Sequence, residues 1–303
     1  MLIFTNIRHG IVLLFFWIIA ASASAQAPTF DRAFAFGNSN SSGGSDAKAT
    51  VVDSQGNTYV TGTFGGTIRF GNLTLYSTGG SDVFVAKLDA AGNCIWAASG
   101  GGSNTDYGRG IGLDAAGNAY VTGIFSGSSA RFGTTSIAAT GPGLFDTYVA
   151  KLSPTGAWLW AVRGGGPGDD YAQAIAVDPT GNSYITGNFN GATISFGTTV
   201  LTNASTANGS DAFVAKLDAG GTWQWAARGG GTNSEGGESI VLDGLGNVYV
   251  TGSVSSLNSN FGNVSLVRTS QNLGLLVASL NSSGNWLWAN SSGGNGGGSG
   301  YGI

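Results

Sequence analysis

One stretch of sequence occurs four times in this chain, and the repetition constrains the fold more than any other feature. Each copy opens with D-x-x-G-N-x-Y-[VI]-T-G and continues with F-G, and the first three copies then contain F/Y-V-A-K-L and W-A-x-x-G-G-G, which are altered in the fourth. The Gly-Asn of the first phrase falls at Gly56, Gly117, Gly181 and Gly246, so successive copies lie 61, 64 and 65 residues apart. A period of this length, built from short strand-like phrases, indicates a repeat architecture.

Each copy contains four phrases that favour strands. In the third copy they cover 174–178, 183–187, 212–217 and 223–227, and they are rich in Val, Ile, Tyr, Phe, Trp and Thr. Two hairpins per copy predict a four-stranded antiparallel sheet, the blade of a β-propeller. A β-helix and a leucine-rich repeat have shorter periods, and a β-sandwich does not need four near-identical copies.

The expected turns have a simple mechanism. An acid at the first turn position accepts hydrogen bonds from backbone N–H groups two or three residues on, and glycine at the fourth supplies a positive φ. The residues that open these turns are Asp53, Asp114, Asp178, Asp243, Asp89, Ser153, Asp218 and Asn281. A calcium loop is the alternative, but it needs six to eight oxygen ligands, and these phrases supply a single carboxylate each.

These motifs resemble the bacterial secreted β-propeller repeat of the SBBP type. The resemblance rests on A-x-D-x-x-G-N-x-Y-V-T-G, D-x-F-V-A-K-L, W and G-G-G, and it extends from Arg32 to the C-terminus. It implies a β-propeller and an extracellular location, and it specifies no activity.

The first 25 residues predict a secretory signal peptide. A basic start at Arg8 and His9 precedes an apolar run over 11–21, and Ala23-Ser24-Ala25 is a small-x-small cleavage site. A retained membrane anchor is the alternative, but the run is shorter than the ~20 residues that span a bilayer. We therefore expect a secreted or cell-surface bacterial protein with no transmembrane segment after cleavage.

Composition excludes several functions. After the predicted cleavage the chain has no His and no Met and a net charge near −5, with few scattered Lys and Arg. It therefore lacks a nucleic-acid-binding footprint, a Ser-His-Asp or Cys-His centre and any His-ligated metal. We expect no metal and no cofactor. The single cysteine, Cys94, occupies the slot of Trp158, Trp223 and Trp286, which predicts an apolar filler.

The repeats are out of phase with both ends. Residues 26–48 hold a segment that matches a fourth strand, followed by a Gly/Ser-rich loop, and the repeats occupy 49–105, 106–169, 170–234 and 235–303. Tyr301-Gly302-Ile303 resembles the start of a further first strand. The expected fold is thus an all-β propeller of about four complete blades plus an N-terminal closing strand, in an incomplete ring truncated at the C-terminus. Closure by four blades alone is the alternative.

Candidate ligand-binding residues come from the connections between blades. An acid stands ten residues after a tryptophan in three copies, as Asp106, Asp170 and Glu235, and Tyr107 and Tyr171 follow the first two. A carboxylate beside a tyrosine could bind a sugar or a cation. The structural interpretation, which we favour, is that each carboxylate accepts hydrogen bonds from the Gly-rich loop.

Other recurring residues predict structure. The F-G phrases, at Phe70, Phe132, Phe196 and Phe261, predict an extra hairpin packed by its Phe, and the W-x-W pairs predict packing between blades. The lysines Lys87, Lys151 and Lys216 follow Asp82, Asp146 and Asp211, and both partners disappear together in the fourth copy, at Gly274 and Ser279. This joint loss predicts an interaction between the Asp and the Lys, within a blade or across blades.

Three functions fit the sequence. The first is a non-catalytic secreted or surface protein for binding, adhesion or scaffolding, with a glycan or another extracellular protein as partner. The second is a carbohydrate-active enzyme, a glycoside hydrolase or polysaccharide lyase that uses the loop carboxylates and Tyr. The third is a purely structural repeat. The near-equivalence of the copies favours the first over the second, because catalysis needs one copy to differ.

Overall fold

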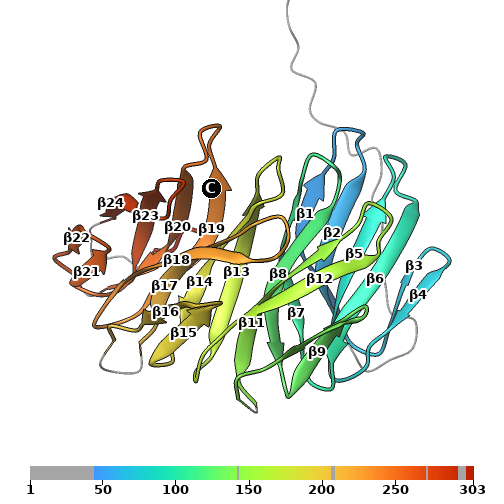
Figure 1. The fold of residues 1–303 in the computed structure, drawn as a ribbon, viewed down its shortest axis with the longest axis horizontal. Helices are drawn as coiled ribbons and strands as arrows, with labels where there is room; N and C mark the ends of the chain where they lie inside the picture. The colour runs from blue at the N-terminus through green and yellow to red at the C-terminus, as the bar shows by residue number, and fades with distance from the viewer. Residues whose placement is uncertain (1–43, 142, 206–208, 271, 293–297) are drawn as a thin grey trace, which may run out of the picture. The chain divides into compact units, whose positions relative to one another are not determined.

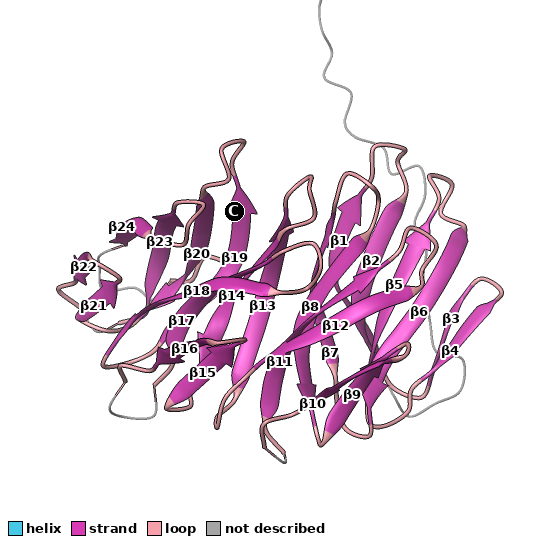
Figure 2. Cartoon of the chain, viewed as in Figure 1, coloured by secondary structure: helices cyan, strands magenta, loops and turns pink. Residues whose placement is uncertain are grey.

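The computed structural model describes residues 44–303, except 142, 206–208, 271 and 293–297. The predicted signal peptide and most of the segment 26–48 lie outside the described residues. What is described folds into β-strands alone, numbered β1 to β24 (Figures 1 and 2). No helix in this part of the chain is long and apolar enough to cross a membrane.

Each copy of the repeat forms a four-stranded antiparallel sheet. In the first blade the order is β1 (Ser45–Val52), β2 (Thr58–Phe64), β5 (Asp82–Leu88) and β6 (Cys94–Gly102). The second blade contains β7 (Tyr107–Leu113), β8 (Ala119–Ser126), β11 (Phe145–Leu152) and β12 (Trp158–Gly164). The third contains β13 (Asp170–Val177), β14 (Ser183–Phe189), β17 (Asp211–Leu217) and β18 (Trp223–Gly231), and the fourth β19 (Glu235–Leu242), β20 (Val248–Val254), β23 (Gly274–Leu280) and β24 (Trp286–Ser291). The predicted propeller blades are confirmed.

In every blade an Asp-Gly turn joins the first strand to the second at the same end of the sheet. Asp53 Oδ1 accepts hydrogen bonds from the backbone N of Gln55 at 3.0 Å and of Asn57 at 2.9 Å, so the contacts reach two and four residues on. Asp53 Oδ2 accepts from Asn57 Nδ2 at 2.8 Å. Gly56 has φ 80°, where an L side chain would be strained. The Gly-Asn pair is therefore fixed by the turn itself.

The F-G phrases form the predicted extra hairpins, and they also connect the blades. The hairpins are β3 (Thr67–Phe70) with β4 (Leu73–Tyr76), β9 (Ser129–Phe132) with β10 (Thr135–Ala138), β15 (Thr193–Phe196) with β16 (Thr199–Thr202), and β21 (Asn258–Phe261) with β22 (Val264–Val267). The outer strand of one blade pairs with the next hairpin, β6 with β9 and β18 with β21. The Gly-Gly-Gly phrases were predicted as loops, and this was wrong in part, because their glycines extend the outer strands so that a neighbouring backbone can approach.

The tryptophans of W-x-W pack between blades, as predicted. Trp158 Nε1 donates back to Ser99 O in the first blade at 2.9 Å, and Trp160 Nε1 donates forward to Ala219 O in the third at 3.3 Å. Cys94, in the first slot of the first blade, is half-buried, and burial raises the pKa of its thiol. One strand thus carries one indole for each neighbouring blade.

The first strands of the blades, β1, β7, β13 and β19, lie next to one another in sequence order. We call them the inner strands. After the fourth blade, Gly298 N donates to Leu273 O at 3.0 Å, as Asp106 N does to Ser81 O and Glu235 N to Ser210 O. Residues 298–300 therefore lie where an inner strand would begin. Among the described strands no ladder joins the fourth blade to the first, so the sheets do not close into a ring.

Candidate functional site

The predicted carboxylates lie at the start of the inner strands and are covered. Asp106, Asp170 and Glu235 are 0%, 0% and 1% exposed. Each accepts a hydrogen bond from a backbone N–H of the preceding Gly-rich segment, with distances of 2.6, 2.6 and 2.7 Å. These are the contacts of the structural interpretation. A ligand role for the three carboxylates stays a prediction that would require the segment above them to open.

Each of these acids faces a second acid from the preceding blade. The pairs are Asp82 with Asp106, Asp146 with Asp170 and Asp211 with Glu235. A Cβ on Gly101 would lie 2.7 Å from Asp106 Oδ2 and 2.8 Å from Asp82 Oδ1, so the first pair meets over a glycine. Burial, reinforced by the neighbouring acid, raises the pKa of Asp106 to about 7 and that of Asp170 to about 8. We call these three pairs the acid pairs.

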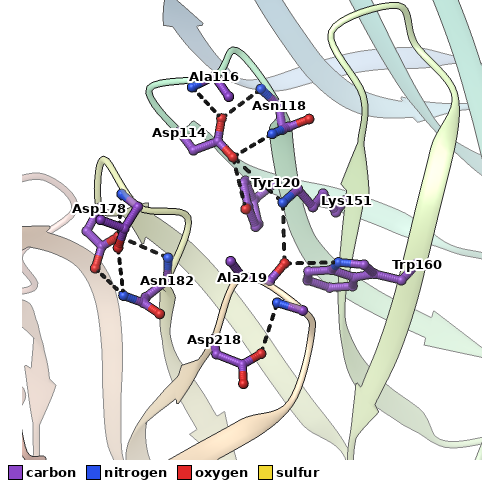
Figure 3. Close-up of polar contacts among 12 residues, drawn as sticks. Asp114, Ala116, Asn118, Tyr120, Lys151, Trp160, Asp178, Asn182, Asp218 and Ala219 are labelled. Carbon is purple, nitrogen blue, oxygen red and sulfur yellow. Dashed lines mark hydrogen bonds and ion pairs between the residues drawn. The ribbon is translucent and has the colours of Figure 1, made fainter.

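The predicted interaction between Asp146 and Lys151 is wrong. Lys151 Nζ lies 3.7 Å from Oδ2 of Asp114, the turn aspartate of its own blade, and donates to Ala219 O of the third blade at 3.3 Å (Figure 3). Asp146 instead forms an ion pair with Arg163 at 3.1 Å. The two residues belong to different polar networks, at opposite ends of the same strand.

The predicted tyrosines are accessible where the carboxylates are not. Tyr107 and Tyr171 are half-buried, and Phe145 lies between them. The ring centroids of Tyr107 and Phe145 are 6.1 Å apart, and those of Phe145 and Tyr171 are 5.9 Å apart. Two adjacent blades therefore present three aromatic rings in a row.

A β-bulge adds polar groups to this row. In every blade the inner strand slips by one residue against its neighbour at the same place, and the bulged residues are Lys48, Arg109, Gln173 and Glu238. Arg109 Nη1 donates a hydrogen bond to Gln173 Oε1. The Arg109 guanidinium lies 5.9 Å from the Tyr107 ring centroid and 5.5 Å from that of Tyr171. We call Tyr107, Arg109, Phe145, Tyr171, Gln173 and Glu238 the inner-strand cluster.

The cluster combines charge with partial burial. Burial lowers the pKa of Arg109, although nearby tyrosines and Glu238 oppose this effect, and the guanidinium stays charged. Burial raises the pKa of Glu238, and Arg109 opposes that shift. Arg109, Gln173 and Glu238 were not predicted as site residues from the sequence. The sequence does mark their position, because its residue differs in every copy while the neighbouring strand residues recur.

The cluster can stack planar or ring-shaped groups and can donate and accept hydrogen bonds. In the part of the chain that the structure describes, no three His, Cys, Asp or Glu side chains come together as a metal site would require. The cluster itself offers aromatic faces, a guanidinium, an amide and a carboxylate as contacts for a ligand.

The match to one family model agrees with the blades. The family model described as "Beta-propeller repeat", SBBP, matches residues 159–192. An uncharacterized WD repeat-containing protein of Acanthamoeba polyphaga mimivirus is 29% identical over 135 residues, which are 41% of this chain and 10% of that protein. A crystal structure of a protein of unknown function from Bacteroides caccae aligns with a TM-score of 0.38 at 11% identity and covers 82% of each chain.

The match at residues 159–192 begins in the outer strand of the second blade and ends just after the second strand of the third. It includes Asp170 and Tyr171, and it ends after the Asp-Gly turn from which the resemblance was first drawn. Residues 159–192 thus match the β-propeller repeat of the SBBP type, in agreement with the four-stranded blades.

Proposed function

We propose that this chain is a secreted or cell-surface bacterial binding protein that holds a glycan at the inner-strand cluster and does not transform it. The blades act as a scaffold, and the ligand contacts the aromatic row of the second and third blades. One observation carries the proposal: the bulged position differs in every blade. Lys48, Arg109, Gln173 and Glu238 give a nearly symmetric scaffold one asymmetric surface.

The chemistry of the cluster supports a sugar ligand. The C–H faces of a sugar ring pack against aromatic rings, and Tyr107, Phe145 and Tyr171 offer three in sequence. Sugar hydroxyls both donate and accept, and Arg109, Gln173 and Glu238 offer donors and acceptors beside the rings. A second extracellular protein is the other partner expected from the sequence, and the experiment below distinguishes it.

The burial of the acid pairs weighs against a glycoside hydrolase or lyase. Such an enzyme needs a carboxyl group or a tyrosine in contact with the scissile bond. Asp106, Asp170 and Glu235 are at most 1% exposed and hold backbone N–H groups. The raised pKa values of Asp106 and Asp170 follow from this burial and are accounted for without catalysis.

A glycan array with the full chain, followed by titration calorimetry with the glycan that binds best, tests the proposal. We expect saturable binding without release of reducing ends. Tyr171→Ala should raise Kd by about tenfold or more, because it removes a stacking face. Arg109→Gln should weaken binding to a similar extent, because it removes the charged donor.

The matched control is Tyr76→Ala. Tyr76 lies in β4 and is 68% exposed, so its loss removes the same type of ring from a surface away from the cluster. Unchanged binding in Tyr171→Ala would contradict the proposed site, and turnover of a bound glycan would support the enzyme. A protein partner captured through the same cluster, with no response on the array, would replace the glycan.

A further inference from the structure

A cavity of about 490 Å³ opens at the opposite end of the inner strands, among the Asp-Gly turns of the first three blades. Its volume lies within the range of small-molecule pockets, about 300–1,000 Å³. The turn beginning at Asp53, the turn at 113–117 and Pro154 form its rim, and Tyr59 and Lys87 form part of its wall. In β7 the lining residue Leu113 lies six positions after Tyr107, which corresponds to about 20 Å along the strand.

Tyr59 lies in the wall of this cavity and has a covered, unpaired hydroxyl. Its side chain is 0% exposed, and its hydroxyl makes no hydrogen bond. The equivalent tyrosines of the second and fourth blades, Tyr120 and Tyr249, donate to Oδ2 of the turn aspartates Asp114 and Asp243 at 3.1 and 3.2 Å. A buried hydroxyl without a partner is unfavourable, so a ligand that bonded it would gain affinity.

Lys87 also keeps hydrogen-bonding capacity. Its Nζ lies 3.5 Å from Asp53 Oδ2, longer than a tight charged hydrogen bond, and 4.7 Å from the Tyr59 ring centroid. Burial opposes the ammonium form, but the nearby Tyr59 hydroxyl and the Asp53 carboxylate outweigh it and raise the pKa of Lys87. The ammonium is therefore charged and has N–H groups for a further acceptor.

In the second blade the equivalent lysine also has a backbone carbonyl as partner, so we call that arrangement closed. Lys151 Nζ lies 3.7 Å from Asp114 Oδ2 and 4.7 Å from the Tyr120 ring centroid, and it donates to Ala219 O of the next blade (Figure 3). In the first blade the corresponding carbonyl belongs to Pro154, which accepts from Trp96 Nε1 at 2.9 Å. Lys87 makes no such bond to Pro154 among the contacts of the described residues, so the place of that acceptor is left to a ligand.

We propose that this cavity binds an uncharged saccharide. The carboxylates of Asp53 and Asp114 also line it, so a free anion would be repelled, while Lys87 would disfavour a cation. Hydroxyl groups both donate and accept, so they suit a wall whose ammonium and phenol can take further bonds, while the two carboxylates already accept hydrogen bonds within their turns. Leu113, Pro154, Val177 and Pro179 supply apolar surface for the C–H face of the ring. The site does not depend on the inner-strand cluster.

The test uses the full chain and saturation-transfer difference NMR with glucose, galactose, mannose and N-acetylglucosamine. Glucuronate and glucosamine serve as the charged comparators. We expect at least one uncharged sugar to bind saturably below about 50 mM. Tyr59→Phe and Lys87→Met should each raise its Kd by about tenfold, because each removes a hydrogen bond and keeps the apolar body of the side chain.

Two controls separate this site from others. Lys151→Met alters the closed counterpart and should leave sugar binding unchanged, and Tyr76→Ala removes an exposed ring of β4 that lies in neither site and should also leave it unchanged. Tyr59→Phe should bind more weakly and yet unfold at the same temperature or higher, since it removes an unpaired buried hydroxyl. Weaker sugar binding together with an unchanged or higher melting temperature distinguishes the loss of a ligand contact from damage to the fold.

Several results would overturn the inference. One is the failure of every uncharged sugar to bind the wild-type chain, and another is tighter binding of glucuronate or glucosamine. Wild-type affinity in both Tyr59→Phe and Lys87→Met would remove the cavity from consideration. Loss of binding in Tyr171→Ala alone would assign the sugar to the inner-strand cluster, which supports the proposed function and contradicts this second site.

Discussion

The junction between the second and third blades can be compared with the equivalent place after the fourth blade. The side chains that occupy these two places differ. At the former, Asp146 faces Asp170 at the start of the next inner strand. At the latter, Gly274 and Gly298 stand in these two places, and a Cβ on Gly274 would collide with the Arg268 guanidinium. Arg268 donates to Val254 O at 2.8 Å and to Asn272 O at 2.6 Å.

The difference identifies which residues belong together. Asp146 and Asp170 come from consecutive copies of the repeat, and at the fourth position glycine replaces both members of the pair. The two carboxyl groups occur together at the junction, next to a glycine that leaves room for them. At the fourth position Arg268 donates to backbone carbonyl groups, and neither acid is present. The pair is thus a unit of the junction and not of the blade.

The largest contrast should come from the tryptophans that face the next blade. Trp160 packs on Tyr120 with centroids 5.9 Å apart and donates to Ala219 O, whereas the equivalent Trp288 is 36% exposed. Trp160→Ala should lower the free energy of unfolding by about 3–5 kcal/mol, and Trp288→Ala by about 1 kcal/mol or less. Guanidinium unfolding followed by circular dichroism measures both, and equal losses would break the contrast.

A smaller effect should follow from filling the space above an acid pair. A Cβ on Gly165 would lie 2.5 Å from Asp146 Oδ1, so Gly165→Ala should lower the free energy of unfolding by about 2–3 kcal/mol. The nearest atom to a Cβ on Gly298 is Leu275 N at 4.0 Å, so Gly298→Ala should change it by less than about 0.5 kcal/mol. The same unfolding assay measures both variants. An unchanged free energy of unfolding in Gly165→Ala would mean that Asp146 and Asp170 can move to make room for the added methyl group.

The pH dependence should reveal the acid pairs directly. Burial raises the folded-state pKa of Asp106 to about 7 and of Asp170 to about 8, so between pH 4 and these values the folded chain binds more protons than the unfolded one. Stability is therefore full below pH 4, falls as the pH rises towards about 8 and then levels off. The melting temperature should be several degrees lower at pH 8.5 than at pH 5.5.

Asp170→Asn provides the control for this pH effect. An amide cannot ionise, so the slope of melting temperature against pH between 5.5 and 8.5 should become shallower than in the wild type. The turn aspartates have lowered pKa values, as at Asp114, where hydrogen bonds from Asn118 and Tyr120 and the charge of Lys151 outweigh the cost of burial. The turn aspartates titrate only at acid pH and do not contribute to the slope between pH 5.5 and 8.5. An unchanged slope in Asp170→Asn would therefore show that the acid pair does not cause the pH dependence.

Much of the fold follows from the sequence, because its signals are local. The Asp-x-x-Gly turns, the alternating strands and the F-G hairpins each depend on residues close together in the chain, such as Asp53 and Gly56. The packing of the W-x-W pairs was predictable from size and spacing. The pairing of the outer glycines with the next hairpin was not, because a glycine in a strand and a glycine in a loop look alike.

The candidate site was harder to predict, for two physical reasons. Asp146 recurs with Lys151 when the copies are aligned, but it accepts hydrogen bonds from Thr140, forms an ion pair with Arg163 and faces Asp170 across the junction. An alignment of the copies does not display these contacts. The bulge at Arg109 carries no side-chain signature, since it is a slip of register between two backbones. Tyr107 and Tyr171 were found because they repeat, and Arg109 and Gln173 were missed because they do not.

The outer strands of the first and third blades pair with the hairpin of the following copy, and this pairing has a consequence for the number of copies. A junction is assembled from the end of one copy and the beginning of the next, and the SBBP match at 159–192 straddles such a boundary. Duplicating or deleting one whole period therefore adds or removes a complete junction and leaves the others intact. The number of blades can therefore change by whole periods while the backbone pairing within the remaining junctions is kept.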